Sequence, residues 1–273
     1  MEKIIKITSH QNPNIKQVIK LKKRRERNLS SLFLIEGYRE LKRAVDAQEE
    51  IVALFYSPSH FLKSNEQSLI DQIKSNGGDT FECAKFIFEK ISYRDRPDGL
   101  LAISRQRKKP LAELEKILSS KKNPFLLIAE KIEKPGNLGT ILRSSDAVGV
   151  DAVIVCDSCT DVYNPNVVRA SVGTLFTVPV IEGTSEEIFA LLKKYKVSIL
   201  AATPSAENIF TEVDMKGSVA ITVGSEQYGL SDFWMQESDI LVNIPMNGVA
   251  DSLNVATATT ILLYEVVRQR KTS

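Results

Sequence analysis

The chain has 273 residues, in which 36 Lys and Arg stand against 34 Asp and Glu, and 43% of the residues are hydrophobic. This balance is typical of a folded globular protein and excludes disordered, collagen-like and coiled-coil chains. No stretch approaches the roughly 18 uninterrupted apolar residues of a membrane helix, and the first residues show no secretory signal pattern. The three cysteines are too few for a disulfide framework. We therefore expect a cytoplasmic protein with no membrane partner.

The charge is distributed unevenly along the chain. Residues 1–122 contain 25 Lys and Arg against 16 Asp and Glu, a net charge of +9, whereas residues 123–273 have a net charge of −7. A basic half joined to an acidic half indicates that the first half meets a polyanion such as RNA, although a solvated basic surface explains the charge equally well. We expect an RNA-binding domain over residues 1–106, a linker with a short helix over 107–122, and a second domain over 123–273.

Short apolar runs alternate with helical periods through the first domain, which is typical of a compact α/β unit. Helices are expected near residues 38–46 and 65–75. The expected strands begin at Phe33, Ile51, Asp79 and Gly99.

Two clusters of basic residues lie in the first half. One closes the first helical pattern, and the other, RQRKKP, comes just before the short helix of the linker. Both fit phosphate contacts, which neutralise the RNA backbone without reading its sequence. From the first cluster we assign RNA contacts to Lys22, Lys23, Arg24 and Arg25.

The second domain repeats the α/β alternation more strongly. Its apolar runs are continuous, which indicates strands covered on both faces and hence a mostly parallel sheet with helices on each side. The expected strands begin at Phe125, Ala152, Phe176, Val197, Val219 and Ile240.

The usual nucleotide-binding and catalytic patterns are missing from the second domain. No GxGxxG follows its first strand, and GSEQYGLS has Leu230 where a phosphate loop needs Lys. Cys156 and Cys159 form a CxxC without further ligands near them, so we interpret them as ordinary cysteines and expect no metal. Both histidines, His10 and His60, lie in the first half, so the second domain by itself holds no Ser-His-Asp or Cys-His arrangement.

Three loops that each follow a strand gather the polar residues of the second domain, at the place where open α/β sheets build their sites. KPGNLGTILRSSDAVGV puts Asn137 near a helix start, as an expected cap. VGSEQYGLS carries Glu226 between glycines that allow close backbone approach. In IPMNGVADSLNVATA we expect a long helix to begin at Asp251 or Ser252, with polar groups and free N–H groups in its first turn. Taken singly, each loop is explained by helix capping as well as by catalysis.

Together and in this order, the three loops resemble the three motifs of the SpoU branch, also called the TrmH family, of the SPOUT RNA methyltransferases. YNPNVVRASVGTLFTVPV is similar to the family's stretch between the first two motifs, and the resemblance covers residues 123–270. The tripeptide ahead of Asn137, Lys-Pro-Gly, differs from the commonest form. TSHQNPNIKQVIKL, FLIEGYREL and RPDGLLAI look like the smaller, ribosomal-protein-like α/β domain that binds RNA in the family's ribosomal RNA enzymes.

The resemblance implies a C-terminal SPOUT domain with a trefoil knot, a homodimer through that domain, and methyl transfer from S-adenosylmethionine to a ribose 2′-hydroxyl of RNA. By motif position it implies the catalytic residues Arg143, Asn137, Glu226, Ser252 and Asn254. It also implies a cofactor pocket formed mainly by backbone near Thr203, Gly224, Ile244, Met246 and Leu253.

The chemistry of methyl transfer agrees with these residues. The reaction is an in-line displacement that requires alignment of the reacting atoms and loss of a hydroxyl proton. Because the pKa of arginine lies above roughly 12, we interpret Arg143 as a group that positions ribose and phosphate and stabilises developing alkoxide charge. Proton removal by a transiently neutral Arg143 stays open. We favour large-subunit ribosomal RNA as the substrate, with transfer RNA or a non-catalytic role in ribosome assembly as the alternatives.

Overall fold

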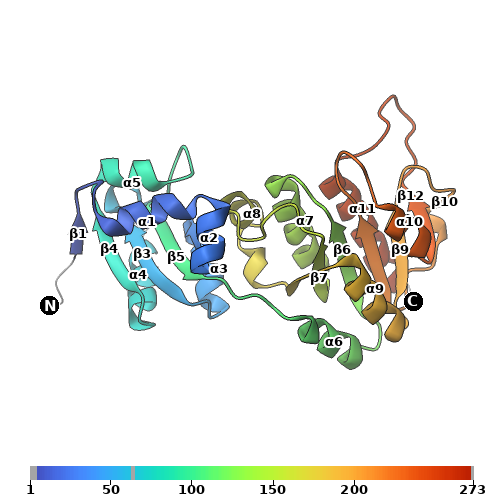
Figure 1. Cartoon of the computed structure of the whole chain (residues 1–273). Helices are drawn as coiled ribbons and strands as arrows, with labels where there is room; N and C mark the ends of the chain where they lie inside the picture. Colours follow the sequence, from blue (N-terminus) through green and yellow to red (C-terminus); the bar gives the residue numbers. More distant parts are fainter. Residues whose placement is uncertain (1–4, 63–64, 272–273) are drawn as a thin grey trace. The chain divides into compact units, whose positions relative to one another are not determined.

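Two separate sheets organise the chain in the computed structural model, which describes residues 5–62 and 65–271. The first unit contains the residues up to Arg107 together with Asp161–Thr177, and the second contains Lys108–Thr160 and the residues from Val178 onward (Figure 1). The segment Asp161–Thr177 thus groups with the first unit, whereas the boundaries expected from the sequence place it in the second domain. Both units are α/β, which confirms the predicted fold class.

The sheet of the first unit has five strands in the order β1-β4-β3-β5-β2. Strand β4 pairs in parallel with β1 and β3, whereas β5 is antiparallel to both β3 and β2. The strands are β1 (Ile5–Ile7), β2 (Leu32–Glu36), β3 (Ile51–Tyr56), β4 (Asp79–Cys83) and β5 (Leu100–Arg105). The strands expected from the apolar runs are confirmed, and the short edge strand β1 is an addition to them.

Helices cover both faces of this sheet. They are α1 (Pro13–Leu21), α2 (Arg24–Ser30), α3 (Tyr38–Asp46), α4 (Glu66–Ser75), α5 (Lys85–Ile91) and α8 (Pro165–Ala170). Helix α1 begins where the Asn12 side chain accepts the N–H of Asn14, and its Pro13 fixes the first helical φ. The apolar faces of α1 and α5 pack on alternate residues of the strands, among them Phe55 and Phe81. The first core lies between these helices and the sheet.

The segment Asp161–Thr177 is held on the first unit by charged and aromatic contacts. The guanidinium of Arg27, of which 1% is exposed, contacts the Asp161 carboxylate at 2.6 Å, and Arg43 donates to the Val172 carbonyl at 2.6 Å. The ring of Tyr163 lies 4.7 Å from that of Phe33 on β2. These contacts explain why a stretch of the second half of the sequence folds as part of the first unit.

The sheet of the second unit has seven strands in the order β10-β12-β9-β11-β6-β7-β8, and every pairing in it is parallel. The strands are β6 (Phe125–Glu130), β7 (Ala152–Cys156), β8 (Val180–Gly183), β9 (Ser198–Ala202), β10 (Asn208–Ile209), β11 (Val219–Val223) and β12 (Ile240–Asn243). The central strands β6, β7 and β11 are buried along their whole length. This confirms the mostly parallel sheet expected from the continuous apolar runs, while the trefoil knot stays a prediction.

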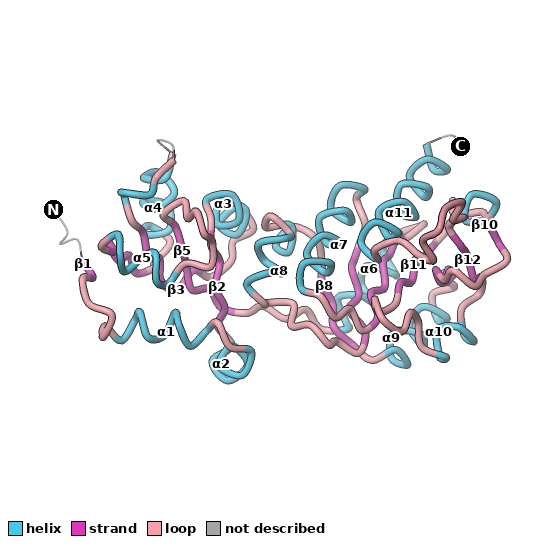
Figure 2. Tube along the Cα trace, turned by 90° about the horizontal axis from the view of Figure 1, so that it is seen from above, coloured by secondary structure: helices cyan, strands magenta, loops and turns pink. Residues whose placement is uncertain are grey.

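The helices of the second unit form a layer on each side of its sheet. They are α6 (Leu111–Ser120), α7 (Pro135–Val148), α9 (Ser185–Lys194), α10 (Asp232–Glu237) and α11 (Val255–Lys271). On one face, α6, α9 and α10 share a core with the strands that includes the fully buried Trp234. On the other face, α7 and α11 lie side by side, joined by a 2.7 Å hydrogen bond between the hydroxyls of Ser144 and Thr260 (Figure 2).

The predicted start of one strand in the second half is wrong. The run FTVPV is expected to be extended from Phe176, but Phe176 ends a 3-10 turn (Thr174–Phe176) and β8 begins only at Val180. Gly173, with a φ of +83°, allows the chain to turn tightly against α3 of the first unit, where a Cβ would lie 3.1 Å from Glu40. Packing on the first unit therefore overrides the local β pattern. Among the described residues, no helix combines the length and the apolar character needed to cross a membrane.

Candidate active site

The three polar loops meet at the carboxyl edge of the second sheet. Strand β6 ends at Glu130, its neighbour β11 ends at Val223, and β12 ends at Asn243. Because all the strands are parallel, the loops that follow them leave from the same edge. The first two loops are in direct contact there, through the side chain of Glu226.

A chain of hydrogen bonds joins one side chain from each loop. The Asn137 amide donates from Nδ2 to Oε1 of Glu226 at 2.6 Å, and its Oδ1 accepts from Nδ2 of Asn254 at 3.2 Å. The direction of the Asn137 amide is therefore fixed by a carboxylate on one side and an amide donor on the other. Three of the residues implied by the family motifs are thus brought together by the fold.

Glu226 is held as an ionised carboxylate. Backbone N–H groups of Glu133 and Lys134 donate to its two oxygens at 3.0 and 3.2 Å, in addition to the Asn137 amide. Burial by itself raises the pKa of Glu226, but these hydrogen bonds outweigh burial and hold the pKa below its usual value of 4.5. At neutral pH the group accepts hydrogen bonds only, and it fixes the beginning of α7 relative to the loop after β11.

Asn137 does not cap α7, contrary to the expectation from the sequence. The helix begins at Pro135 with Lys134 at the capping position, where no side chain caps the first turn. Proline suits the first helical position because its missing N–H needs no partner there. Asn137 is consequently inside the first turn, where its side chain is available to Glu226 and Asn254.

The start of α11 also differs from the expectation. The helix begins at Val255 rather than at Asp251 or Ser252. Asn254 provides the cap, since its Oδ1 accepts the N–H of Ala256 at 3.0 Å. Asn254 therefore joins the start of α11 to the start of α7, while Ser252 lies exposed in the preceding loop.

Arg143 lies apart from this hydrogen-bonded chain. It is six residues beyond Asn137 on α7, which corresponds to about 9 Å along the helix axis. Its side chain is exposed, and within residues 5–62 and 65–271 no hydrogen bond or ion pair engages it. An open hollow of about 340 Å³ lies beside the chain of amides, lined by Asn137, Thr140, Asn254, Ala256, Thr257, Thr260 and Ile261.

The loop after β11 is closed on itself by its own backbone. Ser225 and Gly229 exchange two N–H···O bonds of 2.9 and 3.1 Å, and the Tyr228 N–H donates to Oγ of Ser225 at 3.0 Å. Gly224 is required in this loop, because a Cβ there would lie 2.2 Å from the backbone of Gly229. These contacts shape the loop from which Glu226 reaches the start of α7.

The residues expected at the cofactor lie next to the same edge of the sheet. Thr203 follows β9, with its N–H donating to the Val242 carbonyl at 3.0 Å, and Gly224 follows β11. Ile244 and Met246 follow β12, and their side chains are half-buried, like that of Leu253. Half-buried apolar side chains beside buried backbone fit the adenosyl and methionyl parts of S-adenosylmethionine.

Glu130 is a buried group that the sequence reading missed. Of this residue at the end of β6, 1% is exposed, and its Oε2 accepts the N–H of Ser231 at 2.8 Å. Glu130 therefore connects the end of β6 to the end of the GSEQYGLS loop. The sequence signal for this residue is its position, since a charged residue at the end of a continuous apolar run falls where a buried strand ends.

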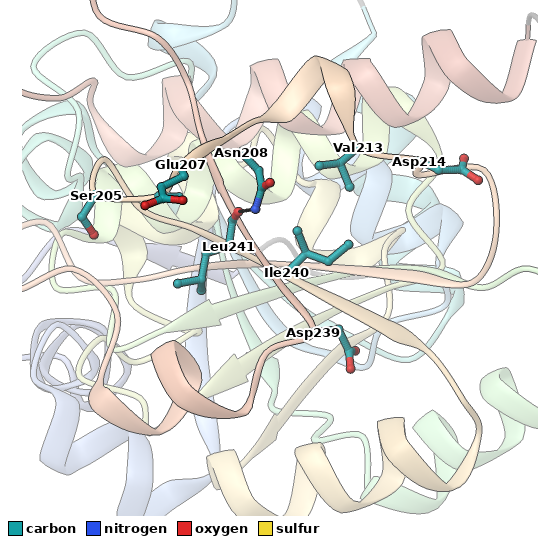
Figure 3. Close-up of a pocket in the computed structure, with 9 residues that line it drawn as sticks. Ser205, Glu207, Asn208, Val213, Asp214, Asp239, Ile240 and Leu241 are labelled. Carbon is teal, nitrogen blue, oxygen red and sulfur yellow. Dashed lines mark hydrogen bonds between the residues drawn. The ribbon is translucent and has the colours of Figure 1, made fainter.

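A second hollow, of about 670 Å³, lies along the edge strand β10 and its neighbour β12 (Figure 3). Figure 3 shows three carboxylates around it, those of Glu207, Asp214 and Asp239. Asp239 already accepts the N–H of Ile199 at 2.8 Å. None of the residues expected from the motifs lines this hollow.

The basic cluster of the first unit divides into exposed and internal groups. Lys23, Arg24 and Arg25 are exposed, whereas Arg27 is buried against Asp161. The amine of Lys22 donates to the Ser92 carbonyl at 3.1 Å, and burial lowers its pKa. Lys22 is thus partly committed to the fold of the first unit.

Neither CxxC cysteine is bonded to another. Cys156 is buried, and burial raises the pKa of its thiol, while Cys159 is exposed. Within the described part of the chain, no three His, Cys, Asp or Glu side chains are arranged to hold a metal ion.

Two family profiles match the chain. That of the SpoU rRNA methylase family matches residues 124–264, and that of the MRM3-like substrate binding domain matches residues 12–102. A 23S rRNA (guanosine(2553)-2′-O)-methyltransferase of Bacillus subtilis is 26% identical over 260 residues, which cover 95% of this chain and 98% of that protein. A 23S rRNA (guanosine-2′-O-)-methyltransferase of Coxiella burnetii is 30% identical over 89% of this chain and 98% of that protein.

Solved structures resemble the whole chain. The crystal structure of an RNA 2′-O ribose methyltransferase, 35% identical, covers 98% of this chain and all of its own with a TM-score of 0.82. An AdoMet-bound rRNA methyltransferase from Sinorhizobium meliloti, 28% identical, covers 97% of this chain and 98% of its own with a TM-score of 0.87. Given these matches and the motif residues assembled at one edge of the sheet, the chain belongs to the SpoU rRNA methylase family.

Proposed function

We propose that the chain transfers a methyl group from S-adenosylmethionine to the ribose 2′-hydroxyl of a nucleotide in large-subunit ribosomal RNA. The hydrogen-bonded chain of Glu226, Asn137 and Asn254 carries the proposal, because it orders one group from each family motif beside the expected cofactor residues. The names of the relatives support ribosomal RNA as the substrate. A cytoplasmic location, where that RNA is made and assembled in bacteria, is part of the proposal.

When bound, S-adenosylmethionine supplies the methyl group, so that an O–C bond forms as the S–C bond breaks and a neutral thioether leaves. The task of the protein is to align the hydroxyl with that methyl group and to assist loss of the hydroxyl proton. The ordered amides of Asn137 and Asn254 are suited to hold the nucleotide, and the anionic Glu226 fixes their orientation.

Arg143 is assigned to the ribose and the adjacent phosphate. Its guanidinium engages no other described residue, so it is available to an anionic substrate. It stabilises the charge that develops on the ribose oxygen as the proton leaves. Transfer of that proton to a transiently neutral Arg143 is the alternative route, and a pH–rate profile separates the two.

The separation of Arg143 from Asn137 supports a homodimer through the second unit. In a dimer with its active sites near the subunit interface, Arg143 of one copy serves the Asn137 and Asn254 of the other. Mixing the Arg143→Ala chain with the impaired Asn137→Ala chain after joint refolding should then raise activity to about a quarter of wild type, because half of the dimers carry one complete site. No recovery in verified mixed dimers would show that each chain uses its own Arg143.

The substrate is tested with methyl-tritiated S-adenosylmethionine and size-fractionated RNA from a strain that lacks the protein. Label should enter large ribosomal RNA, resist base hydrolysis at one ribose, and be absent with Arg143→Ala. Label in transfer RNA would preserve the chemistry and overturn the substrate assignment. Lack of S-adenosylmethionine binding, measured by calorimetry, would overturn the enzymatic proposal and favour a non-catalytic factor.

A further inference from the structure

Tyr228 is an exposed aromatic residue at the candidate active site. Of the surface of Tyr228, 78% is exposed. The other strongly exposed aromatic residues in the described part of the chain are Phe86, with 53% exposed, and Tyr264, with 51% exposed. Within residues 5–62 and 65–271, the ring of Tyr228 makes no aromatic or cation–π contact and its phenol makes no hydrogen bond. Nothing in the core or in the hydrogen-bond network of the unit explains an aromatic side chain at this position.

The loop that carries Tyr228 is closed by its own hydrogen bonds. Its N–H is bonded to Oγ of Ser225, and the Ser225–Gly229 pair closes the loop on both sides of it. Gly224 is packed against the backbone of Gly229, so the two ends of the loop lie close together. An aromatic ring on such a support loses little conformational entropy when it binds a ligand.

The position of the ring is tied to the chemistry of the site. Tyr228 is two residues from Glu226, so their Cα atoms are at most about 7 Å apart. Glu226 in turn is anchored to Asn137 at 2.6 Å and to the backbone of α7. The loop therefore carries the backbone of Tyr228 close to the side chains to which we assign the nucleotide.

The charge of the second half limits how it holds RNA near the reaction. Residues 123–273 have a net charge of −7, so nonspecific phosphate attraction is weak there, in contrast to the first half. Stacking of bases on aromatic side chains also contributes to the binding of single-stranded RNA, and it tolerates any base. Where the strand beside the target ribose is single-stranded, its unstacked bases are available for such stacking.

We propose that Tyr228 is a stacking platform for an unpaired base of the RNA substrate next to the target ribose, a role that rests on the proposed function. The ring positions the strand and does not take part in bond making. Gln227, its exposed neighbour on the same loop, lacks a stacking surface and has no such role.

The test compares Tyr228→Ala, Tyr228→Phe and the control Gln227→Ala in methylation of transcribed large-subunit ribosomal RNA. Tyr228→Ala should raise the KM for RNA roughly tenfold, as expected for loss of one stacked base, and change kcat less. Tyr228→Phe and Gln227→Ala should stay within about twofold of wild type, because the phenol hydroxyl contributes nothing to stacking. Affinity for S-adenosylmethionine and molecular mass in solution should be unchanged in all three variants.

A second measurement identifies the base. Once the target is mapped, RNA fragments with an abasic site at each flanking position are compared in wild type and Tyr228→Ala. One abasic position should weaken binding to wild type and have no further effect in the variant. Additive losses at every position would overturn the inference.

The remaining outcomes are also decisive. A weaker affinity of Tyr228→Ala for S-adenosylmethionine would assign the ring to the cofactor pocket, and a lower mass in solution would assign it to a contact between protein chains; either overturns the inference. A normal KM for RNA in Tyr228→Ala overturns it while leaving the proposed function intact. Failure of the wild type to methylate any RNA fraction removes the proposed function, and this inference with it.

Discussion

Arg27 in the first unit and Arg143 in the second occupy opposite environments. The guanidinium of Arg27 is buried, contacts the carboxylate of Asp161, and donates to the carbonyls of Leu21 and Lys22 at 2.9 Å. Arg143 is exposed, and the described part of the chain offers it no partner. The first arginine serves the fold, and the second is left for a ligand.

The carboxylates of the two units differ in a similar way. Glu40 in the first unit is paired with Arg94 at 2.7 Å. Glu226 in the second unit is held by two backbone N–H groups and an amide rather than by a cation. Arg27 and Glu40 are thus committed to ion pairs within the first unit, whereas Glu226 is ordered by neutral donors and Arg143 is left without a partner among the described residues.

The largest expected effect is that of Arg143→Ala on catalysis. We expect turnover to fall at least about a thousandfold, as for loss of a group that stabilises developing charge, with affinity for S-adenosylmethionine within a few-fold of wild type. Single-turnover methylation and calorimetry measure the two quantities. A strong loss of cofactor binding would mean that Arg143 is part of the cofactor pocket.

Arg27→Met tests the other side of the comparison. Asp161, with 9% of its side chain exposed, would be left as a buried unpaired charge. We expect the first unit to lose about 3–5 kcal/mol of unfolding free energy, measured by urea denaturation, without loss of S-adenosylmethionine binding. The double variant Arg27→Met, Asp161→Asn is the control and should recover much of this stability. Equal stability of Arg27→Met and wild type would contradict the structural role of the pair.

Asn137→Ala has a smaller predicted effect. It removes the link between Glu226 and Asn254, so we expect turnover to fall roughly tenfold to a hundredfold, less than for Arg143→Ala, with little change in cofactor affinity. Asn137→Asp keeps the shape but places a second carboxylate against Glu226, and it should be at least as damaging. Normal turnover of Asn137→Asp would show that the hydrogen bonds joining Glu226, Asn137 and Asn254 are not needed for catalysis.

Changes at the third motif should act on substrate and cofactor together. Asn254→Ala removes both the contact to Asn137 and the cap of α11, the latter costing about 1 kcal/mol. Steady-state kinetics should show impaired turnover and a raised KM for S-adenosylmethionine, and Ser252→Ala should show the same pattern more weakly. An effect of Asn254→Ala on stability alone would reduce this residue to a helix cap.

The smallest effects concern pH and have opposite signs in the two units. The pKa of Glu226 is lowered, so its stabilising contribution is present above its usual value of 4.5 and is lost as pH falls below that value. Burial raises the pKa of Glu40 despite its pairing with Arg94, so wild type loses stability relative to Glu40→Gln as pH rises through and above 4.5. Denaturation of Glu226→Gln and Glu40→Gln against wild type between about pH 3 and 6 should therefore give stability differences that change with pH in opposite directions. The same sign in both variants would refute the comparison of the carboxylates.

Much of the fold could be predicted from local patterns. Continuous apolar runs located the buried strands β6, β7 and β11, and helical periodicity gave α3 over residues 38–46 as observed. The start of α11 was misplaced because Asp251 and Ser252 are as suitable for capping as Asn254, and only the contact to Asn137 distinguishes Asn254. Local propensity cannot encode that choice, which depends on α7.

The remaining differences arise from contacts between segments distant in the chain. Arg27 lies in a run of basic residues whose local pattern does not distinguish it from its neighbours. It is buried against Asp161, which is 134 residues away in the sequence. The segment around Phe176 has β character locally, but it packs on the first unit. For the site, motif positions gave Asn137, Glu226 and Asn254, whereas the roles of Glu130 and Tyr228 required the folded loop.

The central claim is that the edge of the second sheet is a ribose methylation site for ribosomal RNA. The most direct test maps ribose 2′-O-methyl groups in large-subunit RNA as positions that resist alkaline cleavage. The RNA comes from a strain that lacks the protein and is complemented either with wild type or with the double variant Asn137→Ala, Arg143→Ala. We predict one nucleotide that is protected with wild type and unprotected with the double variant. Identical maps from the two complemented strains would contradict the account.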